Sequence, residues 1–197
     1  MNKDRHDNSG GGRKLTHSEL LAARLTTEQA LAAERLPVTL ILHNIRSLYN
    51  VGSIFRTADS ALAAEVVLCG FTPHPPREEI RKTALGADES VPWRYEKSIK
   101  DAIARERAAG KTIVALELAA KSRDYSSLEA RDFPLAIVLG NEITGVDDDI
   151  LELCDFAIEI PMRGVKHSLN VAVSTGIALY EAARLYNLYN ENANNNR

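Results

Sequence analysis

Hydrophobic positions along this chain fall into five short, nearly continuous runs separated by amphipathic segments. The runs read VTLILHNI, EVVLCGF, TIVALEL, PLAIVLG and FAIEIP, at residues 38–45, 65–71, 112–118, 134–140 and 156–161. Continuous apolar runs are typical of parallel strands that are covered on both faces. Helical periodicity lies at 52–62, 98–109, 147–153 and 169–189. The alternation predicts an α/β fold with a mainly parallel sheet, to which 91–95 would add a short strand.

The pattern changes at both ends of the chain. Residues 1–14 are polar and glycine-rich, which predicts a disordered tail. Thr16 and Glu19, and likewise Thr26 and Gln29, have the spacing of a capping box. We therefore expect a helical N-terminal extension at 15–36 and one domain at 37–189. The segment NENANNNR at 190–197 predicts a second disordered tail.

Composition limits the classes of partner. The 197 residues carry a net charge of −3 and a pI near 6.0, so nucleic-acid binding would have to rest on a local basic patch. The two cysteines, Cys69 and Cys154, lie in apolar surroundings, as expected for reduced, buried thiols of a cytoplasmic protein. No apolar run approaches the roughly 18 residues of a membrane span. No Cys/His cluster has metal-ligand spacing, so we expect no metal.

Three polar loops follow predicted strands, at 43–52, 139–146 and 161–170. Ligands of open α/β sheets bind beyond the carboxyl ends of the strands. In the first loop Asn50 precedes a helix, and Arg56 lies one turn inside it on the polar face. A helix N-terminus with a nearby arginine is a candidate anion site. The alternative is an ordinary surface arginine that pairs with Asp59 or with other acidic neighbours.

The second loop, LGNEITGV, places Glu142 in a turn. It lacks the Lys-Ser/Thr of a phosphate-binding P-loop, and a tight turn that caps the next helix also explains it. In the third loop Ser168 and Asn170 are favoured N-cap residues. His167 beside Ser168 lacks a G-x-S-x-G elbow, which argues against a hydrolase. Small residues then open the last helix, which predicts close packing against a ligand or another helix: Ala172, Ser174, Gly176 and Ala178.

Together the loops resemble the three signature motifs of the SpoU (TrmH-like) family of RNA ribose 2'-O-methyltransferases, within the SPOUT superfamily. The motifs read NVGSIFRTAD, IVLGNEITGV and IPMRGVKHSLNVAVSTGIALYE, and the resemblance covers residues 38–186. KTALGADESVPW also resembles the segment between the first two motifs in tRNA-modifying members. The resemblance implies a SPOUT α/β fold with a C-terminal deep trefoil knot, an S-adenosylmethionine pocket formed by the knot, and a homodimer.

The resemblance also implies roles for individual residues. Matches to catalytic positions are Asn50, Arg56, Glu142, Ser168 and Asn170. Matches to cofactor-binding positions are Leu116, Glu117, Leu139, Gly140, Asn141, Gly145, Ile160, Met162, Ser168 and Leu169.

The partner implied by the resemblance is RNA, with tRNA and a D-loop guanosine as the leading substrate. The alternatives are rRNA, a non-catalytic RNA-binding module of the same fold, and a different nucleotide-binding enzyme such as a nucleotide hydrolase. The chain shows no separate RNA-binding domain. RNA contacts would therefore fall on local basic residues: Arg46, Arg77, Arg81, Lys82, Lys121, Arg123, Arg163 and Lys166.

Overall fold

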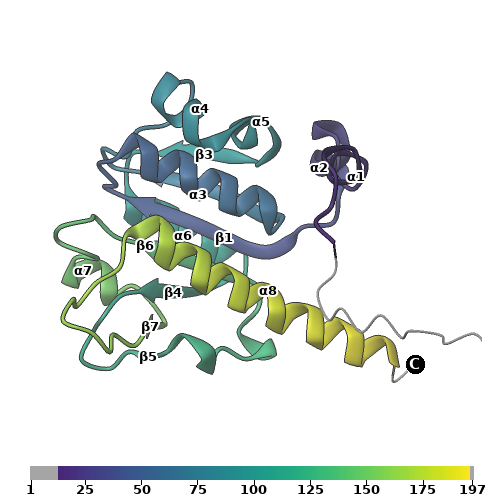
Figure 1. The fold of residues 1–197 in the computed structure, drawn as a ribbon. Helices are drawn as coiled ribbons and strands as arrows, with labels where there is room; N and C mark the ends of the chain where they lie inside the picture. The colour runs from purple at the N-terminus through teal and green to yellow at the C-terminus, as the bar shows by residue number, and fades with distance from the viewer. Residues whose placement is uncertain (1–12, 196–197) are drawn as a thin grey trace, which may run out of the picture.

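A single seven-stranded sheet organises the computed structural model, which describes residues 13–195 (Figure 1). Its order is β3-β2-β1-β6-β4-β7-β5, and every neighbouring pair is parallel. The strands are β1 (Leu36–His43), β2 (Ala63–Cys69), β3 (Trp93–Glu96), β4 (Thr112–Leu116), β5 (Arg123–Asp124), β6 (Leu135–Leu139) and β7 (Phe156–Glu159). The predicted parallel α/β fold is confirmed.

Helices cover both faces of this sheet, which explains its continuous apolar strands. One face packs on α3 (Leu48–Ser60), α4 (Glu78–Ala84), α5 (Ala87–Ser90) and α8 (Val171–Asn195). The other face packs on α6 (Ile99–Ala108) and α7 (Asp148–Leu151). Successive side chains of β1 point to opposite faces of the sheet, so Leu40 and Leu42 pack in the core of the first face and Ile41 packs in that of the second. Two 3₁₀ turns, η1 (Tyr125–Ser127) and η2 (Ala130–Asp132), precede β6.

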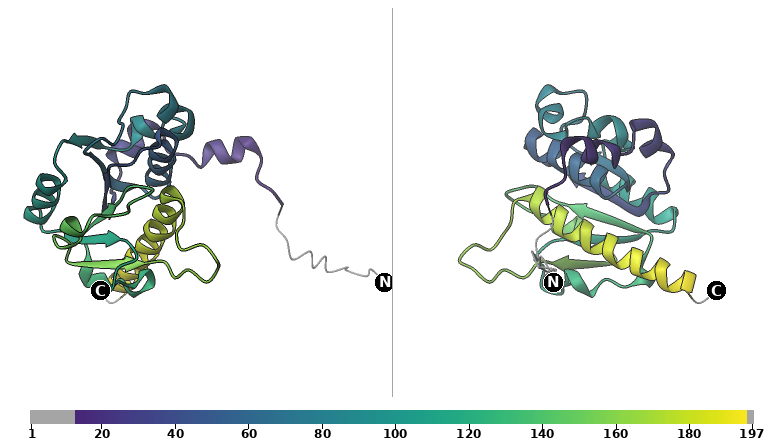
Figure 2. Two further views of the ribbon diagram at one scale, coloured as in Figure 1. Left: turned by 90° about the vertical axis from the view of Figure 1, so that its left-hand side faces the viewer. Right: turned by 45° about the vertical axis from the view of Figure 1, so that its right-hand side comes forward.

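The N-terminal extension forms two short helices, α1 (His17–Ala22) and α2 (Thr27–Ala32), which lie beside the domain (Figure 2). Both predicted capping boxes are present, at Thr16 and at Thr26. Arg35 ties the extension to the domain, because its guanidinium donates to the carbonyls of Ala30, Ala63 and Ser90. The tail predicted at 1–14 lies, up to residue 12, outside the described residues.

The helices differ from the sequence predictions at the start of α3, at the end of α8 and between β2 and β3. Helix α3 begins at Leu48 instead of residue 52, because the Ser47 hydroxyl accepts a hydrogen bond from the Asn50 amide and caps the helix there. Helix α8 continues to Asn195, so residues 190–195, predicted to be disordered, are helical; 196–197 lie outside the described residues. The pattern also missed α4 and α5, which are short and are separated by Leu85 in a left-handed conformation.

Close backbone packing occurs at one glycine of α3. A Cβ on Gly52 would lie 2.0 Å from the Thr83 hydroxyl and 2.3 Å from the Ile80 carbonyl oxygen, so only glycine lets α3 and α4 approach this closely. At Gly176 the nearest atom to such a Cβ is a Thr57 methyl at 3.7 Å, an ordinary contact. The close packing predicted for the start of α8 is therefore not required at Gly176 within this chain.

Both cysteines are free thiols. Cys69 is fully buried and Cys154 is half-buried. Burial raises the pKa of Cys69 to about 12 and that of Cys154 to about 11, so neither thiol ionises near neutral pH. Across residues 13–195, no helix combines the length and the apolar character needed to cross a membrane.

Candidate active site

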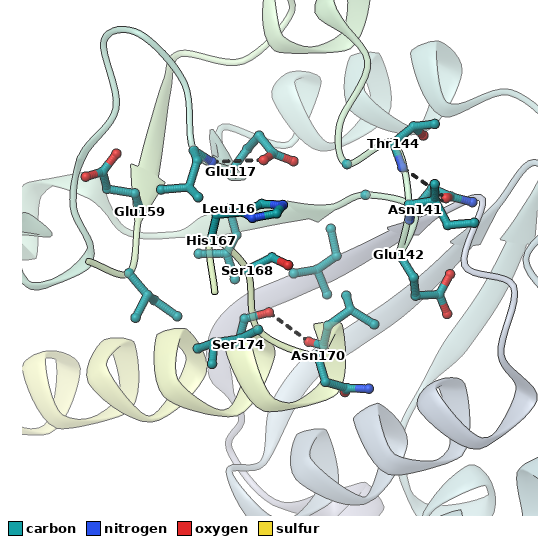
Figure 3. A pocket seen from close by; sticks show the side chains of 18 of the residues that line it. Leu116, Glu117, Asn141, Glu142, Thr144, Glu159, His167, Ser168, Asn170 and Ser174 are labelled. Atoms are coloured by element: carbon teal, nitrogen blue, oxygen red, sulfur yellow. Dashed lines mark hydrogen bonds between the residues drawn. The ribbon is translucent and has the colours of Figure 1, made fainter. Parts of the chain in front are cut away.

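A hollow of about 580 Å³ lies at the carboxyl ends of β4, β6 and β7, where the start of α8 closes it (Figure 3). All ten predicted cofactor-binding residues line it: Leu116, Glu117, Leu139, Gly140, Asn141, Gly145, Ile160, Met162, Ser168 and Leu169. Three of the five predicted catalytic residues line it as well, namely Glu142, Ser168 and Asn170. The structure thus brings segments 116–118, 139–145 and 159–174 to one place.

The loop after β6 is a closed, glycine-dependent turn. The backbones of Asn141 and Gly145 bond each other in both directions, at 3.0 and 2.9 Å. A Cβ on Gly140 would lie 2.2 Å from the Gly145 carbonyl carbon, and Gly145 has φ +71°. The Asn141 side chain accepts from the Ile143 amide at 2.8 Å and donates to the Asn44 carbonyl at 2.7 Å. Contacts within the loop and one to Asn44 thus hold its shape, and α7 begins after it with Asp147 as its N-cap.

Glu117 holds that loop against the end of β4. Its carboxylate accepts from the Leu118 amide at 2.9 Å and from the Val146 amide at 2.8 Å. A Cβ on Gly145 would lie 2.3 Å from the same carboxylate, so the glycine makes room for it. The family resemblance implied only that Glu117 matches a cofactor-binding position. Its side chain has a positioning role that no local pattern in the sequence indicates.

Glu142 occupies the N-terminus of α3. Its carboxylate accepts from the amides of Arg46 (2.9 Å) and Ser47 (3.0 Å) and from the Asn50 side chain (2.9 Å). Burial opposes ionisation, but these hydrogen bonds outweigh it and lower the pKa of Glu142. The anion site predicted at this helix N-terminus is therefore already filled by a carboxylate of the chain itself.

A hydrogen-bonded relay joins the three motifs. Asn50 donates to Glu142 and accepts from the Asn170 amide group at 3.1 Å. Asn170 is also the N-cap of α8, since its side-chain oxygen accepts from the Ala172 amide at 2.9 Å. Of the two N-cap candidates in the third loop, Asn170 is thus the structural one. The relay orients three polar side chains from three distant segments at one edge of the hollow.

Among residues 13–195, the side chains of Arg56 and Ser168 have no such partners. Arg56 is exposed on α3 and does not line the hollow. Within the described residues its guanidinium forms no ion pair, and Asp59 instead accepts a hydrogen bond from Ser90, so the predicted alternative of an Arg56–Asp59 pair is wrong. Ser168 is exposed at the rim of the hollow, beside Leu169. Both side chains are free to meet a bound molecule.

The residues of the hollow suit a cofactor of nucleoside size. The volume of the hollow falls within the range of roughly 300–1,000 Å³ that is typical of small-molecule sites. Leu116, Leu139 and Ile160 supply an apolar wall, and the closed loop after β6 supplies polar backbone. Over residues 13–195, no group of three or more His, Cys, Asp or Glu side chains is arranged to hold a metal ion.

Comparisons with known proteins agree on one family. The sequence profile of the SpoU rRNA Methylase family matches residues 37–180. The tRNA (guanosine(18)-2'-O)-methyltransferase of Escherichia coli K12 is 31% identical over 156 residues, which is 79% of this chain and 67% of that protein. The chain spans about two thirds of the length of the curated relatives it matches, 66% and 67% for two of them.

Solved structures give the same result. The TrmH/SpoU tRNA-modifying enzyme of A. aeolicus superposes with a TM-score of 0.73 at 26% identity, over 82% of this chain and 81% of that one. The AdoMet-bound rRNA methyltransferase of Sinorhizobium meliloti superposes with a TM-score of 0.70 at 32% identity, over 77% of this chain and 60% of that one.

Proposed function

This chain belongs to the SpoU rRNA Methylase family, and from that premise we propose that it transfers a methyl group from S-adenosylmethionine to a ribose 2'-hydroxyl of RNA. The observation that carries the proposal is the hollow, which the second and third motifs and every predicted cofactor-binding residue line, and whose edge Asn50 of the first motif joins through Glu142 and Asn170. A second support is that one neighbour of the same family, 32% identical, is an AdoMet-bound enzyme.

The chain's own residues would bind and orient the cofactor. Bound S-adenosylmethionine supplies an electrophilic methyl group on a sulfonium. Leu116, Leu139 and Ile160 provide apolar surface for the adenine, and the backbone of 139–145 provides its hydrogen-bonding groups. Glu117 keeps that backbone in place. The carboxylates of Glu117 and Glu142, which also line the hollow, already accept hydrogen bonds from backbone amides of the chain.

Arg56 would act on the RNA rather than as a base. A guanidinium stays protonated at neutral pH, so it does not abstract the hydroxyl proton. It binds the phosphate next to the reacting ribose and stabilises the alkoxide that develops. The proton passes to that phosphate or to solvent. The relay from Asn170 through Asn50 to Glu142 orients the polar edge along which the ribose lies.

We include the family's knot and homodimer in the proposal. A trefoil knot would be formed by residues 158–181 threading through a loop of the chain. Two observations support the knot: β6 lies between β1 and β4 in the sheet, and α8 packs against α3. For the dimer, support comes from exposed apolar side chains on α3 and α8: Tyr49 (56% exposed), Val173 (52%) and Tyr180 (52%).

For the substrate we propose tRNA, with a D-loop guanosine as the leading candidate. The E. coli relative, a tRNA (guanosine(18)-2'-O)-methyltransferase, supports it. rRNA is the second candidate, which the S. meliloti rRNA methyltransferase favours. A non-catalytic RNA-binding module of this fold is the third, but the predicted catalytic residues are all present.

Two measurements test the proposed function. Isothermal titration should show binding of S-adenosylmethionine, and labelled methyl transfer to bulk tRNA and to rRNA should identify the accepting RNA. Mapping of the labelled nucleotide should then find a 2'-O-methylribose. Cofactor binding without transfer to either RNA would refute the proposal in favour of the non-catalytic module.

A further inference from the structure

A second hollow, of about 470 Å³, lies beside the first one on the same edge of the sheet. The segment between β2 and α4 forms most of it, together with Arg46 and Leu48 of the loop after β1. Its chemistry is set by two arginines and three rings: Arg46, Arg77, Phe71, His74 and Tyr95. The proposed methyl-transfer step leaves this hollow unused.

The charges of the two hollows are opposite. The first is lined by three glutamates, Glu117, Glu142 and Glu159, whereas no carboxylate lines the second. Within residues 13–195, neither Arg46 nor Arg77 forms an ion pair, and the adjacent Glu78 pairs with Lys82 at 3.0 Å. The second hollow is therefore a local site for an anion, although the net charge of the whole chain is −3.

The rings present an exposed and firmly held stacking surface. Phe71 is 62% exposed, and its amide donates to the Asn44 side chain at 3.1 Å. The Tyr95 hydroxyl donates to the Gly70 carbonyl at 2.7 Å, and the His74 ring lies 5.1 Å from the Tyr95 ring. An exposed aromatic face next to unpaired arginines is the combination that binds an unstacked nucleotide.

The two hollows are mechanically connected. Asn44 accepts from the Phe71 amide with its side chain, and its carbonyl accepts from Asn141 in the loop after β6. Arg46 lines the second hollow, while its backbone amide donates to Glu142 of the first. A nucleotide in the second hollow is therefore held at a fixed place relative to the methyl-transfer site.

We propose that the second hollow binds a nucleotide of the substrate RNA near the methylated one, with its base on Phe71 and its phosphate on Arg46 and Arg77. This inference rests on the proposed function, because it assigns a second contact of the same RNA. It places the recognition of an unstacked neighbouring nucleotide in the catalytic domain itself.

Substitutions at Phe71 test the stacking contact on the full chain. Phe71→Ala should weaken binding of labelled bulk tRNA, and raise its KM, about 5- to 150-fold, the range for loss of one stacked base. Phe71→Tyr should restore both values, whereas Phe71→Leu, which keeps apolar area without a π-face, should not. Titration with S-adenosylmethionine should be unchanged in all three variants, which shows that the first hollow is intact.

Arg77→Gln tests the phosphate contact. It should reduce the slope of log affinity against log salt by about 0.7, the value for one contact to a single strand. Arg131→Gln, at an exposed arginine before β6, is the matched control and should leave the slope unchanged.

Two results would overturn the proposal that the second hollow binds a nucleotide: equal tRNA affinity of Phe71→Tyr and Phe71→Leu, or unchanged tRNA affinity of Phe71→Ala and Arg77→Gln. Either result would leave the proposed function standing. Wild-type protein that transfers no methyl group to any RNA would overturn the proposed function. In that case RNA affinity of the Phe71 variants still decides whether the second hollow binds RNA.

Discussion

Replacing Glu142 by glutamine should destabilise the fold by about 1–2 kcal/mol at neutral pH. In the native protein one carboxylate oxygen accepts from Ser47 and Asn50, and the other accepts from Arg46. A glutamine keeps only one accepting oxygen, so its amide nitrogen faces one of these donors. A hydrogen bond to a charged group is worth about 1.5–3 kcal/mol and an acidic residue at a helix N-terminus about 0.3–1 kcal/mol. Because Glu142 is exposed, solvent screens these interactions, and the expected loss of unfolding free energy is therefore only about 1–2 kcal/mol.

The destabilisation caused by Glu142→Gln should become smaller as the pH falls. The pKa of Glu142 is lower in the folded state than in the unfolded chain, so the unfolded chain binds more protons as the pH falls. The stabilisation is therefore fully present above the unfolded pKa, about 4.3, and is lost as the pH falls through the lower native pKa. Urea unfolding of wild type and Glu142→Gln should differ by a constant amount from pH 8 to pH 5, and the difference should shrink below about pH 4.

A control separates the helix cap from a general loss of charge. Glu34→Gln makes the same change at an exposed glutamate that has no hydrogen bond or ion pair within the described residues. It should leave the unfolding free energy within about 0.5 kcal/mol of wild type. If Glu142→Gln unfolds like wild type but loses methyl transfer, the reasoning is refuted, and the carboxylate acts on the substrate instead of holding α3.

Three further changes probe other contacts. Gly52→Ala should cost about 1–3 kcal/mol in urea unfolding, because its methyl group overlaps α4, whereas Gly176→Ala should be neutral or stabilise by up to about 1 kcal/mol; equal losses would contradict the packing described. Arg56→Lys should lower kcat at least tenfold with unchanged S-adenosylmethionine affinity, because a point charge does not reproduce the guanidinium fork, and near-normal turnover would rule out that role. Glu117→Ala should weaken cofactor binding in a titration by releasing the Val146 amide, and unchanged affinity would show that the loop holds itself.

The sequence predicted the parts of the site that local pattern determines. Apolar runs located the strand ends, and the three loops were expected at the same edge because parallel strands place their carboxyl ends together. The cap contributed by Glu142 was not predictable in this way, because it lies more than 90 residues from the helix that it caps. The same holds for Glu117, whose partner Val146 is 29 residues away. Periodicity reports which face of an element is buried, but not which distant side chain meets its end.

The relay from Asn170 through Asn50 to Glu142 has a consequence for how the protein matures. Its two bonds close separations of 120 and 92 residues, so chain entropy opposes them until the elements between have folded. Asn170 also begins the last helix, which leaves the ribosome after every strand has been synthesised. A nascent chain can therefore bury most of its sheet before it has a working site. Catalysis therefore begins only after α8 has docked, and a chain that stops before residue 170 lacks both Asn170 and the helix that covers one face of the sheet.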